Sequence, residues 1–256
     1  SYCGIVAFKP SFGCIARAGA KLLSDTLDTV GTMARTVPDA ALFAAAMSGR
    51  HAWLVKPLGE VLSRPLRIGI CRTYEWSQAD VDTQNALARA EQALKKARLF
   101  EVKDLKLPTD FETLAKAQTQ VQLFEQAHNL AHEHIAHFER LSPRLQGILQ
   151  SGKDVTHAQY DAALQHIDRC RQQLQTVFQD VDVLLAPSAQ GEAPENLENT
   201  GDPVFCRIWT VLHTPAINVP AGLGAKGMPI GLQVVGAVGA DALTLAAAHA
   251  VHQHLT

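Results

Sequence analysis

The chain has 256 residues, of which 47% are hydrophobic and 19% charged, and its formal net charge is −2. This composition is typical of a soluble globular protein that buries a large core. Lys and Arg are scattered without a basic stripe, which argues against a nucleic-acid partner, and no uninterrupted apolar run is long enough to span a bilayer. We therefore expect a cytoplasmic protein without a nucleic-acid or membrane partner.

Cysteine and histidine patterns argue against metal or disulfide chemistry. The five cysteines are an odd number at irregular spacings and include no CxxC pair, so we expect reduced thiols. The histidine-rich stretch "HNLAHEHIAH" at 128–137 does not match the zinc-protease motif, because Ala136 stands where the second histidine is required. We predict no metal site and no cofactor.

The first third of the chain combines strands, loops and helices. Residues 1–36 carry Gly and Pro between short apolar runs, which is typical of strands and loops. In "TVPDAALFAAAMSG" a helix is predicted, with Pro38 in its first turn and Gly49 at its end. "LRIGIC" at 66–71 is predicted as a buried strand, followed by an amphipathic helix within 77–97.

The middle of the chain is predicted to be helical. Apolar positions recur at helical spacing from Phe111 to Phe138, with His128 in the one gap as a half-buried core histidine. A second amphipathic helix is predicted for 156–178, and "SPRLQGILQSG" between the two is interpreted as a connector.

The last third returns to strands. "VDVLLAPS" at 181–188, "AINVPAG" at 216–222 and "IGLQVVGAV" at 230–238 are predicted strands, and 240–255 a closing helix. The loop at 189–203 is too polar for a core. Loops at strand ends are where α/β proteins usually place function.

Five segments together carry a family resemblance: "YCGIVAFKPSFG", "SDTLDTVGTMARTVPDAALFAAAM", "DVDVLLAPSA", "TGDPVFCRIWTVLHTPAINVPAG" and "GMPIGLQVVG". In this order, across nearly the whole chain, they resemble the amidase signature family. The resemblance implies an α/β fold with a mixed sheet flanked by helices, truncated at the N-terminus, residues 1–256 being the C-terminal part of a single domain. It also implies hydrolysis of carboxylic amides by a serine nucleophile, a second serine in a cis peptide and a lysine.

That resemblance places the catalytic residues outside this chain. The family's Gly-Gly-Ser turn lies just upstream of the motif that matches "SYCG", so we expect no catalytic residue here and no activity of this chain alone. Ser1, Ser11 and Ser24 are not assigned to the triad, and Lys9 is interpreted as part of a structural Lys-Pro turn. No GxSxG nucleophile turn occurs in the sequence.

The same resemblance suggests residues that line the substrate pocket. "NTGDPVFCRIWT" passes close to the substrate in the family, which makes Thr200, Asp202 and Phe205 candidates, and Arg144 in "SPRLQG" lies near where relatives place an arginine. The alternative for Thr200 and Asp202 is a loop followed by a helix cap, and the alternative for Arg144 is a solvated charge at a helix end. His213 departs from the usual pattern and is expected near the floor of the cleft or on its surface.

Several functions stay open at this point. The chain is the C-terminal part of an amidase, a noncatalytic scaffold or binding fragment, or an amidotransferase A-subunit-like glutaminase, although the middle helices lack the signatures of a transamidation enzyme. The expected partners are a small-molecule amide and the missing N-terminal segment. We also predict a homodimer, because the apolar run within residues 1–36 is expected to be exposed.

Overall fold

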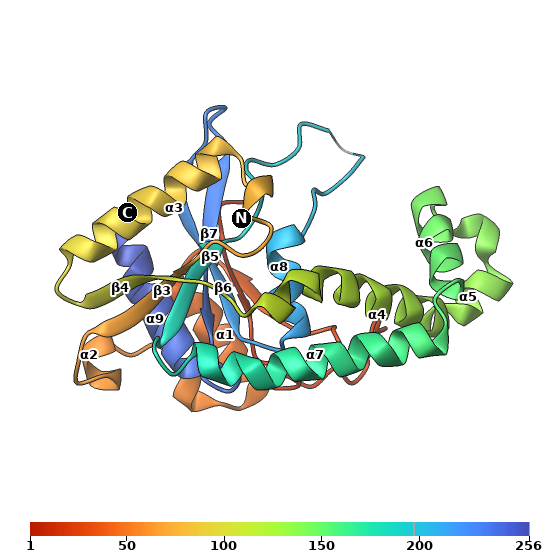
Figure 1. The fold of residues 1–256 in the computed structure, drawn as a ribbon, viewed down its shortest axis with the longest axis horizontal. Coiled ribbons are helices and arrows are strands. Elements are labelled where there is room, and N and C mark those ends of the chain that lie inside the picture. Colours follow the sequence, from red (N-terminus) through yellow and green to blue (C-terminus); the bar gives the residue numbers. More distant parts are fainter. Residues whose placement is uncertain (197, 256) are drawn as a thin grey trace.

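The computed structural model describes residues 1–196 and 198–255. In this part of the chain seven strands form one mixed sheet in the order β2-β1-β6-β7-β5-β3-β4 (Figure 1). The strands are β1 (Val6–Lys9), β2 (Thr32–Ala34), β3 (Leu66–Cys71), β4 (Phe100–Leu105), β5 (Val183–Pro187), β6 (Ala216–Leu223) and β7 (Pro229–Gly236). β3 is parallel to β4 and β5, and all other pairs are antiparallel. The predicted mixed sheet flanked by helices is thus confirmed.

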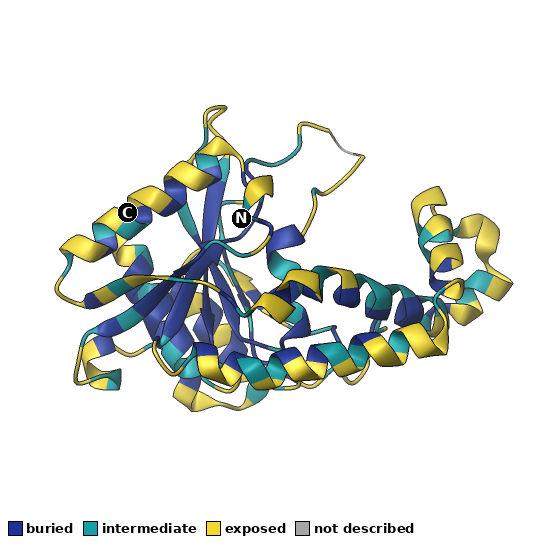
Figure 2. Cartoon of the chain, in the orientation of Figure 1, coloured by how far each residue is buried: buried dark blue, intermediate teal, exposed yellow. Residues whose placement is uncertain are grey.

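Helices cover both faces of the sheet. One layer contains α1 (Val37–Ser48), α2 (Leu58–Val61), α3 (Val81–Lys96) and α9 (Asp241–Leu255), and the other contains α4 (Leu114–Asn129), α7 (His157–Val177) and α8 (Val204–Val211). Side chains of β5 alternate between the two layers, so the strand is buried on both faces, as its continuous apolar sequence indicates (Figure 2). Among the described helices, none combines the length and apolar character needed to cross a bilayer.

The ends of α1 follow from its sequence. The Thr36 side chain accepts a hydrogen bond from the Asp39 N–H at 3.2 Å, and Pro38 lies in the first turn. Gly49 ends the helix with a φ of 69°, a left-handed conformation that glycine adopts without strain. The predicted helix and both of its ends are confirmed.

The prediction of a single helix from Phe111 to Phe138 is wrong. α4 ends at Asn129, and a short α5 (Ala131–Ala136) follows after Leu130, whose backbone is not helical. The apolar spacing continues, but the chain has left the sheet, so Ile135 finds no core and is 83% exposed. His128 is exposed rather than half-buried, with its ring packed on Phe124 at 4.2 Å.

The predicted connector is also wrong, because it forms α6 (Pro143–Lys153). Ser142 caps this helix by accepting a hydrogen bond from the Leu145 N–H at 3.3 Å. Gly152 lets α6 approach α4, since a Cβ there would lie 2.2 Å from the carbonyl oxygen of Leu123. Gly152 is therefore a packing contact between α6 and α4. Together, α5 and α6 form an arm that projects from the sheet (Figure 1).

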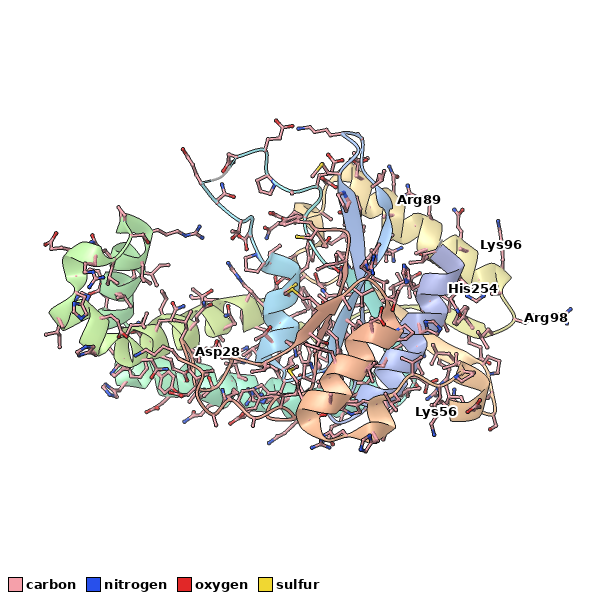
Figure 3. The ribbon with its side chains drawn as sticks, turned by 180° about the vertical axis from the view of Figure 1, so that it is seen from behind. Asp28, Lys56, Arg89, Lys96, Arg98 and His254 are labelled. Atoms are coloured by element: carbon pink, nitrogen blue, oxygen red, sulfur yellow. The ribbon has the colours of Figure 1, made fainter. Side chains whose placement is uncertain are left out.

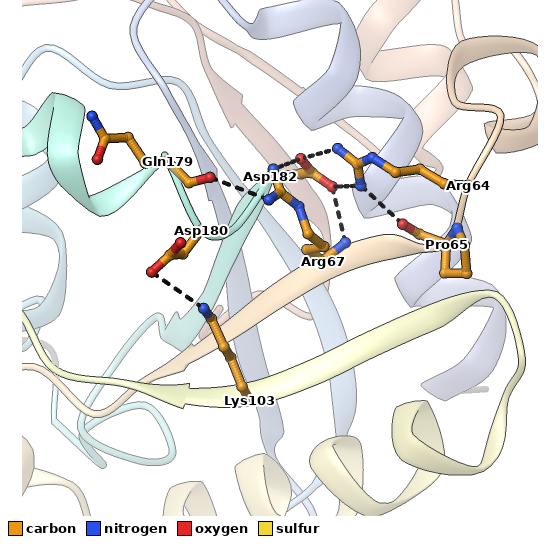
Figure 4. Close-up of polar contacts among 7 residues, drawn as sticks. All are labelled: Arg64, Pro65, Arg67, Lys103, Gln179, Asp180 and Asp182. Carbon is orange, nitrogen blue, oxygen red and sulfur yellow. Dashed lines mark hydrogen bonds and ion pairs between the residues drawn. The ribbon is translucent and has the colours of Figure 1, made fainter.

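An ion cluster joins the starts of the parallel strands β3 and β5. Asp182 accepts paired hydrogen bonds from the Arg64 guanidinium at 2.7 and 2.8 Å and bonds from the side chain and N–H of Arg67, both at 2.9 Å (Figure 4). Burial alone would raise the pKa of the Asp182 carboxyl, but the arginine bonds hold it well below its usual range. Paired bonds of this kind fix the relative position of both strands.

Candidate functional site

A row of residues crosses the sheet on the face covered by α8. The strand register aligns Ala7 of β1 with Asn218 of β6, Asn218 with Gln233 of β7, and Gln233 with Ala186 of β5. Asn218 and Gln233 are buried polar side chains in otherwise apolar strands. The Gln233 Nε2 donates to the carbonyls of Pro187 at 2.6 Å and Phe205 at 2.9 Å, which attaches α8 to the sheet.

Above this row lies a cavity of about 340 Å³, which we call the apolar cavity. Its lining includes Ser1, Ala7, Phe8, Lys9, Thr29, Gly31, Thr32, Met33, Ser188, Cys206, Trp209, Thr210, Ala216, Asn218 and Gln233. Three of these residues have buried polar atoms without a hydrogen-bond partner among the described residues: Ser188 Oγ, Trp209 Nε1 and Asn218 Oδ1. Buried polar groups nearly always have partners, so these three atoms in the cavity wall are exceptions that need an explanation.

Lys9 is a partly buried cation at the edge of the cavity. Its ammonium donates to the carbonyl of Pro10 at 3.2 Å and to that of Thr214. Burial lowers the pKa of Lys9 to about 8, with Asp241 partly opposing the shift. The ammonium is thus held by one backbone carbonyl from the turn after β1 and one from the segment between α8 and β6.

The hydroxyls of Ser1, Ser11 and Ser24 have partners other than a base. Ser1 Oγ accepts from the Gly231 N–H at 2.9 Å, Ser11 Oγ donates to Asp241 at 2.7 Å, and Ser24 Oγ donates to Glu125. Within residues 1–196 and 198–255, none of these hydroxyls bonds to a lysine or histidine. A serine becomes nucleophilic only when a base within hydrogen-bond reach takes its proton, and this geometry does not form that pair.

Cys206 lines the same cavity but is not an activated thiol. Its Sγ donates to the carbonyl of Ser188 at 3.3 Å. Burial raises the pKa of the Cys206 thiol. A nucleophilic cysteine needs a lowered pKa. The geometry therefore favours contact between the neutral Cys206 thiol and a ligand over attack by a thiolate.

His213 supports the cavity from outside. Its ring stacks on Phe12 at 4.0 Å, and its Nε2 lies 2.8 Å from both the Thr26 carbonyl oxygen and the Arg171 Nη2. Burial lowers the pKa of His213 to about 4, and the Arg171 and Lys9 cations add to the effect. The residue is a neutral link between the turn after β1, α7 and the loop around Thr26.

The family model described as Amidase matches residues 1–245. The chain belongs to the Amidase family. The A subunit of the glutamyl-tRNA(Gln) amidotransferase from Ralstonia pickettii (strain 12J) is 30% identical over 99% of this chain and 62% of its own length. A crystal structure of an amidase is 26% identical with a TM-score of 0.89, and the match covers 100% of this chain and 59% of that one. The corresponding A subunit from Thermotoga maritima, 22% identical over 96% of this chain and 57% of its own, shares the fold with a TM-score of 0.77.

This amidase-family chain therefore spans about three fifths of the length of the relatives that it matches.

The predicted pocket residues differ in their distance from the apolar cavity and in their burial. Phe205 is buried in the first turn of α8, beside the cavity-lining Cys206, and its carbonyl accepts from Gln233. Thr200 and Asp202 are exposed in the preceding loop, where Asp202 pairs with Arg207 at 3.0 Å.

Arg144 lies apart from the other predicted residues. It is exposed on α6, in the projecting arm. None of the four predicted residues belongs to the lining of the apolar cavity, so a role in substrate binding stays a prediction for each of them.

Sequence reasoning missed Asn218, Gln233 and Ser188. The first two are single polar residues within the apolar runs "AINVPAG" and "GLQVVG", and the third directly follows the buried strand β5. A polar residue inside a fully buried strand is expensive unless it has partners. That cost is the signal that could have identified them.

We expect the His213→Asn variant to weaken the pH dependence of stability. Because the folded-state pKa lies below the unfolded value, wild-type stability is full above about pH 6.5 and is lost as the pH falls towards about 4. After allowance for solvent screening, the loss is about 1–2 kcal/mol. Urea unfolding at pH 7.5 and pH 4.5 measures it, and Asn tolerates the positive φ of 62° at this position. Burial also lowers the pKa of His252, which is present in both proteins, so equal pH dependence in both would contradict the assignment to His213.

Proposed function

We propose that this chain forms one wall of an amide-hydrolysing site, whose Ser-cisSer-Lys triad is supplied by residues outside 1–256. The observation that carries the proposal is the apolar cavity with its unpartnered polar atoms. Trp209 Nε1 can donate to a carbonyl, and Asn218 Oδ1 can accept from an N–H. A carboxamide offers both groups, and the apolar lining accommodates its acyl chain.

Two further points favour a nucleophile outside these residues. Among the described residues, the hydroxyls of Ser1, Ser11 and Ser24 bond to no base, and Lys9 is occupied by backbone carbonyls. The relatives that match the chain are longer, and their remaining length has room for a catalytic segment. The resemblance supplies the chemistry: the nucleophilic serine forms an acyl-enzyme, which water then hydrolyses.

Ammonia release from a panel of simple amides tests this function. The protein that the gene encodes and the chain of residues 1–256 are assayed side by side, each with its intact mass determined. We expect turnover only by a protein that contains the triad, and no covalent labelling of residues 1–256 by a fluorophosphonate. Turnover by residues 1–256 alone would place the nucleophile within this chain, and no turnover by the encoded protein would refute amide hydrolysis.

The panel also separates amide hydrolysis from the two alternative functions, an amidotransferase-like glutaminase and a noncatalytic binding protein. Glutamine is included because the A subunit of glutamyl-tRNA(Gln) amidotransferase is among the similar proteins. Preference for glutamine favours an amidotransferase-like glutaminase. Amide binding without turnover by the encoded protein favours a noncatalytic binding protein.

All five cysteines are free thiols, which agrees with the cytoplasmic location that forms part of this proposal.

The apolar run of β1 is not exposed, contrary to the expectation from the sequence. Val6 and Phe8 are buried because β1 lies between β2 and β6. Exposed apolar side chains lie instead on the outer face of α1, at Leu42, Phe43 and Met47, with Phe43 63% exposed. We propose that this α1 face forms the homodimer contact, because a second copy buries the same stripe on both sides.

Charge on the α1 face should therefore prevent dimerisation. The double variant Leu42→Lys, Phe43→Lys is expected to be a monomer by sedimentation velocity, where the wild type is a dimer. Both side chains are exposed, so the fold is retained. The matched control is Ile135→Lys on α5, another exposed apolar side chain, which should leave the dimer intact. A monomeric wild type would overturn the proposal.

A further inference from the structure

A second cavity of about 230 Å³, which we call the polar cavity, adjoins the apolar one. Lys9, Thr29 and Thr210 line both. The rest of the polar cavity comes mainly from polar side chains, with Gln118 and Gln122 on α4. The two cavities thus meet at Lys9, at the end of β1.

Gln118 contributes a buried side-chain amide to the wall of the polar cavity. Its side chain is only 5% exposed, and its Nε2 donates to Gln122 Oε1 at 2.7 Å. Its Oε1 is buried without a partner among the described residues. A buried amide oxygen without a partner is costly, so this acceptor is available to an N–H of a ligand.

The wall opposite α4 comes from the loop before β2. Asp28 lies in this loop, beside α4 (Figure 3). Its Oδ2 accepts the N–H groups of Leu23 at 2.7 Å and Ser24 at 3.1 Å. These bonds hold the loop in place, and the carboxylate favours a hydrogen-donating ligand over an anionic one.

Lys9 supplies a donor where the cavities meet. An ammonium has three N–H donors, and the carbonyls of Pro10 and Thr214 occupy two of them. The third remains for a ligand oxygen. Together, Lys9 and Gln118 offer one donor and one acceptor, which is the complement of an amide group.

We propose that the polar cavity is a second subsite that binds a second carboxamide of the substrate. The carbonyl oxygen of this group accepts from Lys9, its N–H donates to Gln118 Oε1, and an apolar spacer leads to the reacting amide in the apolar cavity. The substrate class is therefore a molecule with two amide groups joined by an apolar chain. This inference rests on the proposed amide-hydrolysing function and names the substrates of that site.

Calorimetric titration of the chain of residues 1–256 with two probes, hexanediamide and hexanamide, tests the subsite. The probes share a carbon chain and differ in the second amide. We expect hexanediamide to bind about tenfold more tightly, since one hydrogen bond to a buried unpartnered group is worth about 1–2 kcal/mol. Gln118→Met should abolish this preference by lowering the affinity for hexanediamide towards that for hexanamide.

The matched control is Gln120→Met, on the same helix but outside the polar cavity, which should retain the preference. The circular dichroism spectrum reports whether each variant keeps its fold. Equal binding of both probes, binding of neither, or a preference that survives Gln118→Met would overturn the second subsite. The preference without ammonia release by the encoded protein would overturn the hydrolytic function and leave the subsite standing.

Discussion

Trp209→Ala is expected to lower the free energy of unfolding by about 3–5 kcal/mol. Trp209 is 0% exposed and packs in the core between the sheet and the α4, α7 and α8 layer. Its indole also lines the apolar cavity, so truncation enlarges an existing space instead of letting the core close around it. Urea unfolding of the wild type and the variant, monitored by circular dichroism, measures the difference.

Trp209→Phe serves as the control for the indole N–H. Because Nε1 has no partner among the described residues, this change removes volume but no hydrogen bond, and we expect a loss well below that of Trp209→Ala. Trp76→Ala is a second control, since Trp76 is only partly buried. A Trp209→Ala effect below about 1.5 kcal/mol would show that the site collapses readily and that the cavity is not rigid.

Glu125→Gln is expected to destabilise the chain by about 3 kcal/mol. The buried Glu125 carboxylate accepts hydrogen bonds from Ser24 Oγ, from the N–H and hydroxyl of Thr26 at 3.1 and 2.9 Å, and from Tyr160 at 2.7 Å. An amide at this position turns one acceptor into a donor that faces other donors. Thermal and urea unfolding measure the loss.

An independent readout for this prediction is the pKa of Tyr160. Burial and the bond to Glu125 raise the pKa of Tyr160 above its usual value, so spectrophotometric titration should show it lower in Glu125→Gln. Glu133→Gln, on the projecting arm beside the exposed Lys21, is the matched control and should leave stability nearly unchanged, because solvent screens this exposed ion pair. An unchanged tyrosine titration would contradict the role assigned to Glu125.

Local sequence signals predicted those helices and strands whose start, end and buried face are determined by residues within the element itself. α1 formed as expected because its cap, first-turn proline and terminal glycine act within the helix itself. β5, β6 and β7 formed where apolar runs ended at Pro or Gly. The arm was mispredicted because a continuous apolar spacing shows that a helix can bury a face, and not that a core is present to receive it.

The candidate site depends on contacts that no local pattern contains. Ser1 and Gly231 are joined by a hydrogen bond, although 230 positions separate them. A Cβ on Gly231 would lie 2.2 Å from Asn218 Oδ1, so this glycine reflects a neighbour on another strand. The strand order that makes these residues neighbours is a property of the whole sheet.

The sequence by itself determined the family, the α/β class and most helices and strands, because these follow from motifs and from periodic burial along the chain. Only the tertiary structure decided which residues meet. The register of β1, β6, β7 and β5 brought Asn218 and Gln233 into one row, and α4 and the loop around Asp28 together form the walls of the polar cavity. The physical reason is that side-chain partners are selected by distance in the fold, which spacing along the chain does not encode.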